Sequence, residues 1–430
     1  MNPSHVQSAR RLARDAGLSN VTFLESSFEE LLSQDIGKFD FIALHGILSW
    51  VSAETQAQIV RILSERLDAG GLVYVSYNCL PGRAAQEPLR RLFLEDAARR
   101  VGPLEQRVAD AQRFARALRD GGAGYFTQTP TAAARLDEVG TQRQDYVAHE
   151  FFNRDWRPLY HLDVRSAFAA AKLVYVGTTM LVENTDALIP AEVRAPFLEI
   201  QDAAWKEQVR DYITNRQFRV DVYMRGGCRL SAPRQREHLE ALRLCLVADV
   251  SGFEYKLRVP PVEVALARDI YEALFEALAR GPLTMREIVE ATNGKVSEQH
   301  VREACFLTAG LLRPATTATG PTAAACARFN QAAVREALAG DEVPALASPV
   351  LGSGVRIATP DILALAAMEQ GGGDEAVLDR AMAHLTRADR LEANEPGAAE
   401  GARARLRERI AALEAQMVPV WKRLGVSTLA

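Results

Sequence analysis

The first 80 residues alternate short apolar runs with an amphipathic segment. Residues 39–44 (FDFIAL) and 71–78 (GLVYVSYN) are almost wholly apolar runs. Such runs are typical of strands buried on both faces of a parallel sheet. Between them, residues 53–67 place apolar side chains on one helical face, after a capping Ser52 and before a terminating Gly70-Gly71. The pattern predicts a strand–helix–strand crossover of an α/β fold.

The crossover is preceded by a helix and a further apolar run. Asn2 and Pro3 favour the start of a helix that Gly17 would end, and residues 20–24 (NVTFL) then predict a strand. A helix that leads into a central parallel strand normally follows another strand. We therefore expect the chain to begin inside its first domain, which we place at residues 1–82.

The middle of the chain predicts a helical insertion and the remainder of the sheet. Residues 83–145 are charged and rich in Arg and Ala, with helical spacing of their apolar positions. Residues 146–228 contain a helix at 161–171, a strand at 173–177 and an alternating strand near 212–224, which we interpret as completing the sheet.

The C-terminal part predicts a mainly helical region. Residues 258–340 contain three short helices (262–278, 285–291 and one capped by Ser297) followed by a strand, an order similar to a winged-helix module. Its basic and acidic residues are balanced, so packing or partner contact is favoured over DNA binding. Residues 341–430 include a turn-rich loop at 347–354 and a helix at 399–424 that we expect to pack on the body of the protein.

Composition narrows the class of protein. The net charge is -4, with 48% hydrophobic and 25% charged residues, which fits a globular protein and argues against bulk nucleic-acid binding. No apolar run is long enough for a membrane span. The five scattered cysteines lack a CxxC pair, which favours a reducing cytoplasm. No metal site is expected, because Asn153 stands where the second histidine of an HExxH motif would lie.

Four stretches of sequence together resemble a known family. They are residues 39–51 (FDFIALHGILSWV), 71–82 (GLVYVSYNCLPG), 146–160 (YVAHEFFNRDWRPLY) and 215–219 (NRQFR). A fifth stretch that shares the resemblance is residues 347–354 (ASPVLGSG), so the resemblance covers most of the chain. The ordered set resembles S-adenosylmethionine-dependent methyltransferases that carry a methyltransferase regulatory domain, a group that includes bacterial lysine methyltransferases acting on outer-membrane proteins. The resemblance implies a class I, Rossmann-like methyltransferase sheet, S-adenosylmethionine as cofactor and a protein lysine as acceptor.

The sequence departs from the family at its N-terminal end. The first strand, the glycine-rich loop and the acidic residue that ends the second strand are absent, so the resemblance implies an N-terminally truncated sheet. In a doubly wound domain these elements hold the methionine and ribose parts of the ligand. A late start, a fragment and a degenerate copy all fit this pattern.

The resemblance also implies positions for the site residues. Ser26, Ser27 and Phe28 would border the adenine, and His45 and Gly46 would lie beside the reactive end of the cofactor. Trp50 fits a core position or a wall of the site equally well. His45, Tyr77 and Asn78 are the candidate catalytic residues; Tyr77 and Asn78 would position the acceptor, because they offer a ring face, a hydroxyl and an amide carbonyl at a strand end.

Two classes of function remain in competition at this level. The leading hypothesis is a cytoplasmic methyltransferase whose substrate is a protein lysine, without a nucleic-acid partner; a homo-oligomer is left open. The alternative is a non-catalytic interaction protein that has lost cofactor binding. A winged-helix transcription factor is the weaker third reading, because the charges of that region are balanced.

Overall fold

The computed structural model describes residues 3–142, 144–153, 155–259, 262–308, 310–388 and 398–428. These residues form two compact units. The first unit comprises Ser27–Arg229 and the short stretch Arg258–Val262. The second unit comprises the residues up to Ser26, Leu230–Leu257 and the chain from Glu263 onward. Each is described by itself.

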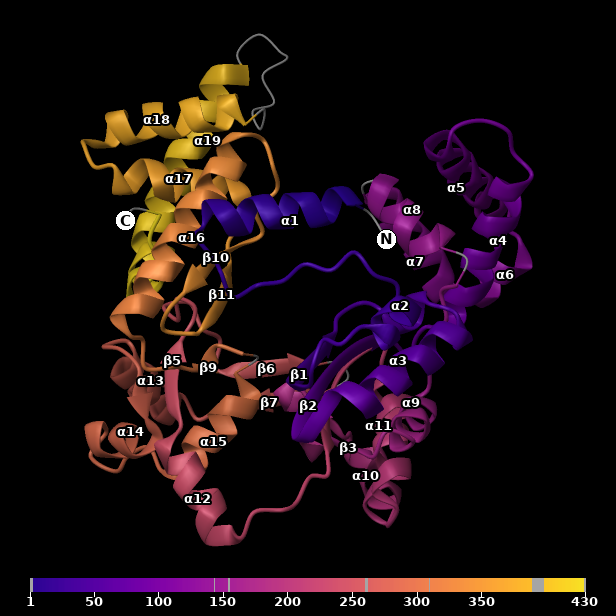
Figure 1. Ribbon diagram of the computed structural model, residues 1–430, viewed down its shortest axis with the longest axis horizontal. Coiled ribbons are helices and arrows are strands. Elements are labelled where there is room, and N and C mark those ends of the chain that lie inside the picture. Colours follow the sequence, from indigo (N-terminus) through magenta and orange to yellow (C-terminus); the bar gives the residue numbers. More distant parts are fainter. Residues whose placement is uncertain are drawn as a thin grey trace. The chain divides into compact units, whose positions relative to one another are not determined.

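A four-stranded mixed sheet forms the centre of the first unit. Its strands are β1 (Phe39–Leu44), β2 (Leu67–Asn78), β3 (Leu173–Thr178) and β4 (Phe218–Arg225), in the spatial order β1-β2-β4-β3. β1 and β2 are parallel and joined through helix α3 (Ala53–Arg66), which confirms the predicted crossover (Figure 1). β4 is antiparallel to both β2 and β3.

The helix before β2 ends earlier than expected. We predicted that Gly70-Gly71 would stop it, but α3 ends at Arg66 and β2 already begins at Leu67, which pairs with Phe39. Gly70 has φ +84° and Gly71 packs against Asp40 and Leu67, so the two glycines shape an irregular start of the strand. The fully buried Leu67 gains more from joining the sheet than from extending the helix.

One face of this sheet is covered by helices, and the other is partly exposed. On one face, Ile59 and Leu63 of α3 and Phe168 of α9 (His161–Ala169) pack with Val73, Val75 and Tyr223 in one apolar core. On the other face lies a cross-strand row in which Phe41 pairs with Leu72, Leu72 with Met224 and Met224 with Val174. Phe41 in this row is 73% exposed and Val174 54%.

Helices flank the sheet, and a further group of helices forms the predicted insertion. α2 (Phe28–Ser33) precedes β1, and the 3-10 turn Leu48–Trp50 follows it. The insertion packs its own core around Phe93, Val108 and Leu136. Its elements are a 3-10 turn (Ala84–Gln86), α4 (Glu87–Ala98), α5 (Leu104–Asp120), α6 (Gly124–Gln128), α7 (Pro130–Gly140) and α8 (Gln144–Phe152). Between β3 and β4 lie the 3-10 turns Leu181–Asn184 and Asp186–Leu188, then α10 (Ala191–Leu198) and α11 (Ala203–Thr214).

The predicted strand at 20–24 is wrong. α1 (Pro3–Asp15) is a helix that ends before Gly17, as expected, but it packs against α16 (Gly320–Leu338) in the second unit. The capping residue Asn2 lies outside the described residues. Residues 20–24 carry no strand pairing, and Val21 and Leu24 are exposed. A strand needs a neighbour for its backbone groups; here the carbonyl of Phe23 accepts instead from the Arg10 side chain at 2.8 Å.

The first half of the second unit has the predicted helix-and-strand order. α13 (Arg268–Leu278), α14 (Met285–Ala291) and α15 (Glu298–Leu307) stand with a three-stranded sheet of order β8-β5-β9. Its strands are β5 (Arg243–Leu246), β8 (Leu283–Thr284) and β9 (Leu312–Pro314), and α12 (Ala232–Ala241) precedes them. The helix predicted from 262 begins only at Arg268, because β7 (Val262–Ala265) pairs with β6 (Lys256–Val259).

The C-terminal half is helical around one hairpin. The segment expected to be a loop at 347–354 forms most of the hairpin of β10 (Ala345–Ser348) and β11 (Ser353–Arg356). The remaining elements are α17 (Thr359–Glu369), α18 (Asp374–Arg387), α19 (Ala398–Ala412), a π-helical turn (Leu413–Met417) and α20 (Val418–Arg423). Leu406, Ile410 and Trp421 enter the core, which confirms that the tail packs on the body. No helix of the described residues is long and apolar enough to cross a membrane.

The packing of α3 on the sheet can be tested by mutation. Leu63 is fully buried in that core, so Leu63→Ala should lower the free energy of unfolding by about 2–5 kcal/mol. Arg61 lies on the exposed side of the same helix, so Arg61→Ala should change it by less than about 0.5 kcal/mol. Chemical denaturation measures both. Equal effects of the two changes would contradict the assigned helix face.

Candidate functional site

The carboxyl ends of β1 and β2 are joined by two serine hydroxyls. The backbone N–H of Gly46, just after β1, donates to Ser76 Oγ at 2.8 Å. The N–H of Asn78, the last residue of β2, donates to Ser49 Oγ at 2.9 Å. Gly46 has φ +63°, a left-handed conformation that glycine adopts without strain. The two segments that follow the parallel strands are therefore fixed side by side, where α/β sheets bind their ligands.

A third segment, distant in sequence, joins the same place. The N–H of Arg157 donates to the carbonyl of Ser49 at 2.8 Å, and the N–H of Leu159 donates to the carbonyl of Asn78 at 2.9 Å. Leu80 returns a bond to the carbonyl of Leu159 at 3.1 Å. The stretch 157–159 thus continues the hydrogen bonding of β2 beyond the end of the strand.

A fourth segment closes on the loop after β2. The N–H of Cys79 donates to the carbonyl of Gln217 at 3.0 Å, and the N–H of Gly82 donates to that of Arg216 at 3.2 Å. A Cβ at Gly82 would overlap the carbonyl oxygen of Arg216, so only glycine permits this approach. We call the assembly of Ser49 and residues 78–82, 157–159 and 216–217 the motif junction. It draws one segment from each of the four stretches of family resemblance within residues 39–219; the fifth, residues 347–354, lies in the second unit.

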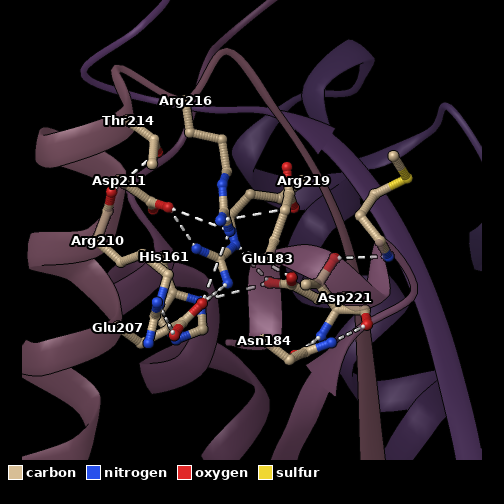
Figure 2. Close-up of polar contacts among 12 residues, drawn as sticks. His161, Glu183, Asn184, Glu207, Arg210, Asp211, Thr214, Arg216, Arg219 and Asp221 are labelled. Atoms are coloured by element: carbon tan, nitrogen blue, oxygen red, sulfur yellow. Dashed lines mark hydrogen bonds and ion pairs between the residues drawn. The ribbon is translucent and has the colours of Figure 1, made fainter. Parts of the chain in front are cut away.

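A buried ion cluster lies behind the motif junction. Arg219 on β4 is fully buried, and its guanidinium donates to Asp221 Oδ2 at 3.0 Å, Asp211 Oδ1 at 2.6 Å and Glu207 Oε1 at 2.7 Å. Asp211 and Glu207 come from α11, so the cluster ties this helix to the sheet (Figure 2). A buried cation that is paired and hydrogen-bonded in this way avoids most of its desolvation cost.

The cluster reaches the motif junction through Tyr77 and Arg216. Tyr77 is buried at the end of β2, and its hydroxyl donates to Asp221 Oδ2 at 2.7 Å. Arg216 contributes its carbonyl to the motif junction, while its side chain lies 3.4 Å from Asp211 and 3.5 Å from Glu183. His161 Nδ1 lies 3.3 Å from Asp221 Oδ2. One carboxylate, Asp221, thus faces β2, α9 and its own strand.

Burial and pairing shift the protonation equilibria in opposite directions. Burial alone would raise the pKa of Asp221, but the His161 hydrogen bond and the Arg219 charge hold that pKa below its usual value. Burial raises the pKa of Asp211 to about 6, against the opposing charges of Arg219 and Arg216. Burial also lowers the pKa of His161, despite its contact with Asp221. His161 is therefore neutral at neutral pH, and Asp221 is ionised.

The candidate residues after β1 lie at this edge of the sheet. His45 is exposed, and its ring stacks on that of Tyr74 with centroids 5.8 Å apart. Its Nδ1 lies 3.0 Å from Tyr74 Oη. Trp50 is half-buried at the end of the 3-10 turn. The structure therefore brings His45, Gly46 and Trp50 into the neighbourhood of Tyr77 and Asn78 through the serine links.

The other candidates have clear structural environments. Asn78 is 3% exposed, and its backbone carries the links of the motif junction. Ser27 caps α2 by accepting from the N–H of Glu30 at 3.1 Å, and Phe28 packs against the core of the sheet. Ser26 is half-buried at the end of the segment that belongs to the second unit.

Sequence reasoning missed the residues that hold this place together. Ser49 and Ser76 link the strand ends, and Asp221 and His161 complete the cluster, yet none was a candidate. One signal was available: Arg219, Asp221 and Tyr223 alternate on one face of a predicted strand. Two opposite charges on the inward face of a strand indicate a buried ion pair.

Comparisons with known proteins identify the family. Residues 1–117 match the family described as a methyltransferase domain, and residues 143–225 match the predicted methyltransferase regulatory domain. An uncharacterized protein of Synechocystis is 34% identical over 375 residues, which are 86% of this chain and 74% of that protein. An uncharacterized protein of Rickettsia prowazekii is 25% identical over 53% of this chain and 41% of its own length.

Solved structures show the same fold. PKMT2 from Rickettsia typhi superposes with a TM-score of 0.66 over 99% of this chain and 87% of that chain, at 18% identity. Its complex with AdoHcy gives a TM-score of 0.65 over 95% of this chain and 86% of that chain, at 16% identity. The fold is that of a class I methyltransferase. The chain belongs to the S-adenosylmethionine-dependent methyltransferases that carry a methyltransferase regulatory domain.

The Tyr77 hydroxyl offers a matched test of the cluster. Tyr77 and Tyr223 are both buried, but Tyr77 donates to Asp221 while the Tyr223 hydroxyl has no hydrogen-bond partner among the described residues. Tyr77→Phe should lower the free energy of unfolding by about 1.5–3 kcal/mol, because it removes a hydrogen bond to a charged group. Tyr223→Phe should leave it unchanged or raise it. Chemical denaturation compares the pair, and an equal loss in both variants would refute the role of the Tyr77 hydroxyl.

The raised pKa of Asp211 predicts a specific dependence on pH. An unfolded aspartate ionises near pH ~4 and the folded one near about 6, so ionisation of Asp211 costs stability as the pH rises between these values. The free energy of unfolding of the wild type should therefore fall relative to Asp211→Asn by up to about 3 kcal/mol from pH ~4 to ~6. Above pH ~6 the difference should be constant. Denaturation at a series of pH values measures it; a difference that does not change, or that rises, would contradict the assignment.

Proposed function

We propose that this protein transfers a methyl group from S-adenosylmethionine to the side chain of a lysine in a protein substrate. The observation that carries the proposal is the motif junction, in which four of the five stretches of family resemblance meet at the carboxyl ends of β1 and β2. The fold shared with PKMT2 supports a lysine as acceptor. Five free thiols and the balanced charge support action in the cytoplasm, without nucleic acid.

One feature beside the end of β1, a pair of stacked rings, fits a bound S-adenosylmethionine. The exposed His45 and the half-buried Tyr74 of β2 form an aromatic stack, and ring faces attract a sulfonium cation. When bound, S-adenosylmethionine supplies the electrophilic methyl group. We propose His45, Gly46 and Trp50 as its contacts in the segment after β1, with Ser26, Ser27 and Phe28 towards the adenine.

The acceptor side of the site would lie at the end of β2. A lysine must lose its proton before it can attack, and a partly desolvated edge favours the neutral amine. The amide carbonyl of Asn78 can accept a hydrogen bond from that amine. The Tyr77 hydroxyl donates to Asp221, so Tyr77 is a positioning residue in this proposal and helps to hold the end of β2. Asn78 is 3% exposed, so its amide would meet the amine only where it reaches the surface, and the exposed His45 would face the reacting groups.

The proposal can be tested with the purified protein. Calorimetric titration should show binding of S-adenosylmethionine, and radiolabelled methyl groups should appear as methyl-lysine in proteins of a cell extract. His45→Ala should lower kcat/KM by about tenfold or more, which corresponds to ~1.4 kcal/mol of transition-state stabilisation. His238→Ala, at an exposed position of α12, is the control and should have no effect. A folded protein without affinity for the cofactor would instead support the non-catalytic interaction protein.

A further inference from the structure

A pocket of about 340 Å³ opens beside the motif junction, within the first unit. Four elements line it: the loop after β2 with Pro81 and Gly82, the loop before β4 with Asn215 and Gln217, helix α7 of the insertion and the 3-10 turn Ala84–Gln86. Its volume is in the range of sites that hold small ligands or side chains. The first two walls are motif segments, and Asn78 lies only three residues from Pro81 in the chain.

The two loop walls are held rigidly by backbone bonds. Cys79 and Gly82 donate to the carbonyls of Gln217 and Arg216, and the Arg83 side chain also reaches the Gln217 carbonyl at 3.3 Å. Because these bonds use only main-chain carbonyls of the loop before β4, the side chains of that loop are not needed to join the two loops. Arg216 is buried in the ion cluster, whereas Asn215 and Gln217 on either side are exposed. Their amides are thus presented at the surface on a fixed frame.

Helix α7 supplies the opposite wall through one of its faces. Ala132, Leu136 and Val139 are buried in the core of the insertion. Thr131, Ala134 and Glu138 are exposed and line the pocket, at the spacing of a single helical face. Glu138 is paired with Arg135 at 2.8 Å, so this wall has a small residue at its centre and no net charge.

We propose that this pocket binds the extended polypeptide segment that flanks the acceptor lysine. The inference rests on the proposed function and adds to it the place and chemistry of substrate recognition. Primary amides carry both donors and acceptors, so Asn215 and Gln217 match the alternating N–H and C=O groups of an extended backbone. The small Ala134 at the centre of the α7 wall leaves room for a main chain. The neutral wall makes recognition depend on the backbone more than on a charged flank.

The test uses a variant that fills the pocket and a matched change elsewhere. Ala134→Trp puts a large ring at the centre of the α7 wall without touching the buried face of the helix. Ala98→Trp makes the same change at an exposed alanine of α4 that does not line the pocket. The probe is an acetylated pentapeptide of alanine with a central lysine and a photoreactive benzophenone residue at one end. Mass spectrometry then locates the crosslinks on the intact protein.

We expect crosslinks within residues 81–86, 131–138 and 215–217 of the wild type and of Ala98→Trp. Ala134→Trp should lower their yield on the order of tenfold, with calorimetric binding of S-adenosylmethionine unchanged. Crosslinks confined to other parts of the protein, no crosslinks, or an undiminished yield in Ala134→Trp would overturn the assignment. Crosslinking at the pocket in a protein that transfers no methyl group would uphold a polypeptide site there and refute the proposed function alone.

Discussion

The burial of one guanidinium group, that of Arg219, imposes the central constraint on the first unit. Arg219 lies on the buried face of β4, which also carries Asp221 and, at Tyr223, enters the apolar core of the sheet, and it has no contact with solvent. A lone charge in such a place would cost several kcal/mol. The fold meets this cost by bringing Asp211 and Glu207 from α11 and Asp221 from β4 into bonding distance. Removing any of these carboxylates would leave Arg219 partly uncompensated.

This constraint links the regulatory region to the place where the strands end. α9, α11 and β4 all lie within the residues that match the regulatory domain. Through Asp221 they contact Tyr77, and through the carbonyls of Arg216 and Gln217 they bind the loop after β2. The edge of the sheet that the proposed chemistry needs is therefore completed by the regulatory region. This region forms two of the four strands and part of the motif junction.

The local pattern of the sequence was enough for the elements with their own periodicity. β1 was predicted with its observed bounds, and α14 and the cap of α15 were also predicted correctly. The failures have a common physical cause, because they depend on contacts distant in the chain. Residues 20–24 have the composition of a strand but no neighbour to pair with. Leu67 leaves its helix because Phe39 offers a sheet partner.

The predictions for the candidate site divide in the same way, between local pattern and contacts distant in the chain. Proximity of His45 and Gly46 to Tyr77 and Asn78 followed from the ends of parallel strands, whereas the ion cluster needs three segments to meet. Only Arg219 and Asp221, two apart in one strand, gave a local sign of it. The roles of Ser49 and Ser76 are fixed by their hydroxyls across a loop, and single serines near strand ends are too common to indicate this.

The backbone bonding between the loops after β2 and before β4 has a consequence for how such proteins diversify. The frame of the pocket is built from main-chain groups, with Gly82 as its one strict steric requirement. Gln217 is exposed on that frame, so single substitutions there can change the preference of the proposed polypeptide site at little cost in stability. Asn215 is exposed too, but it ends α11 in the left-handed conformation (φ +47°), which restricts its replacement to residues such as glycine. Recognition at the proposed site is in that sense modular, with a constant scaffold and one freely replaceable side chain.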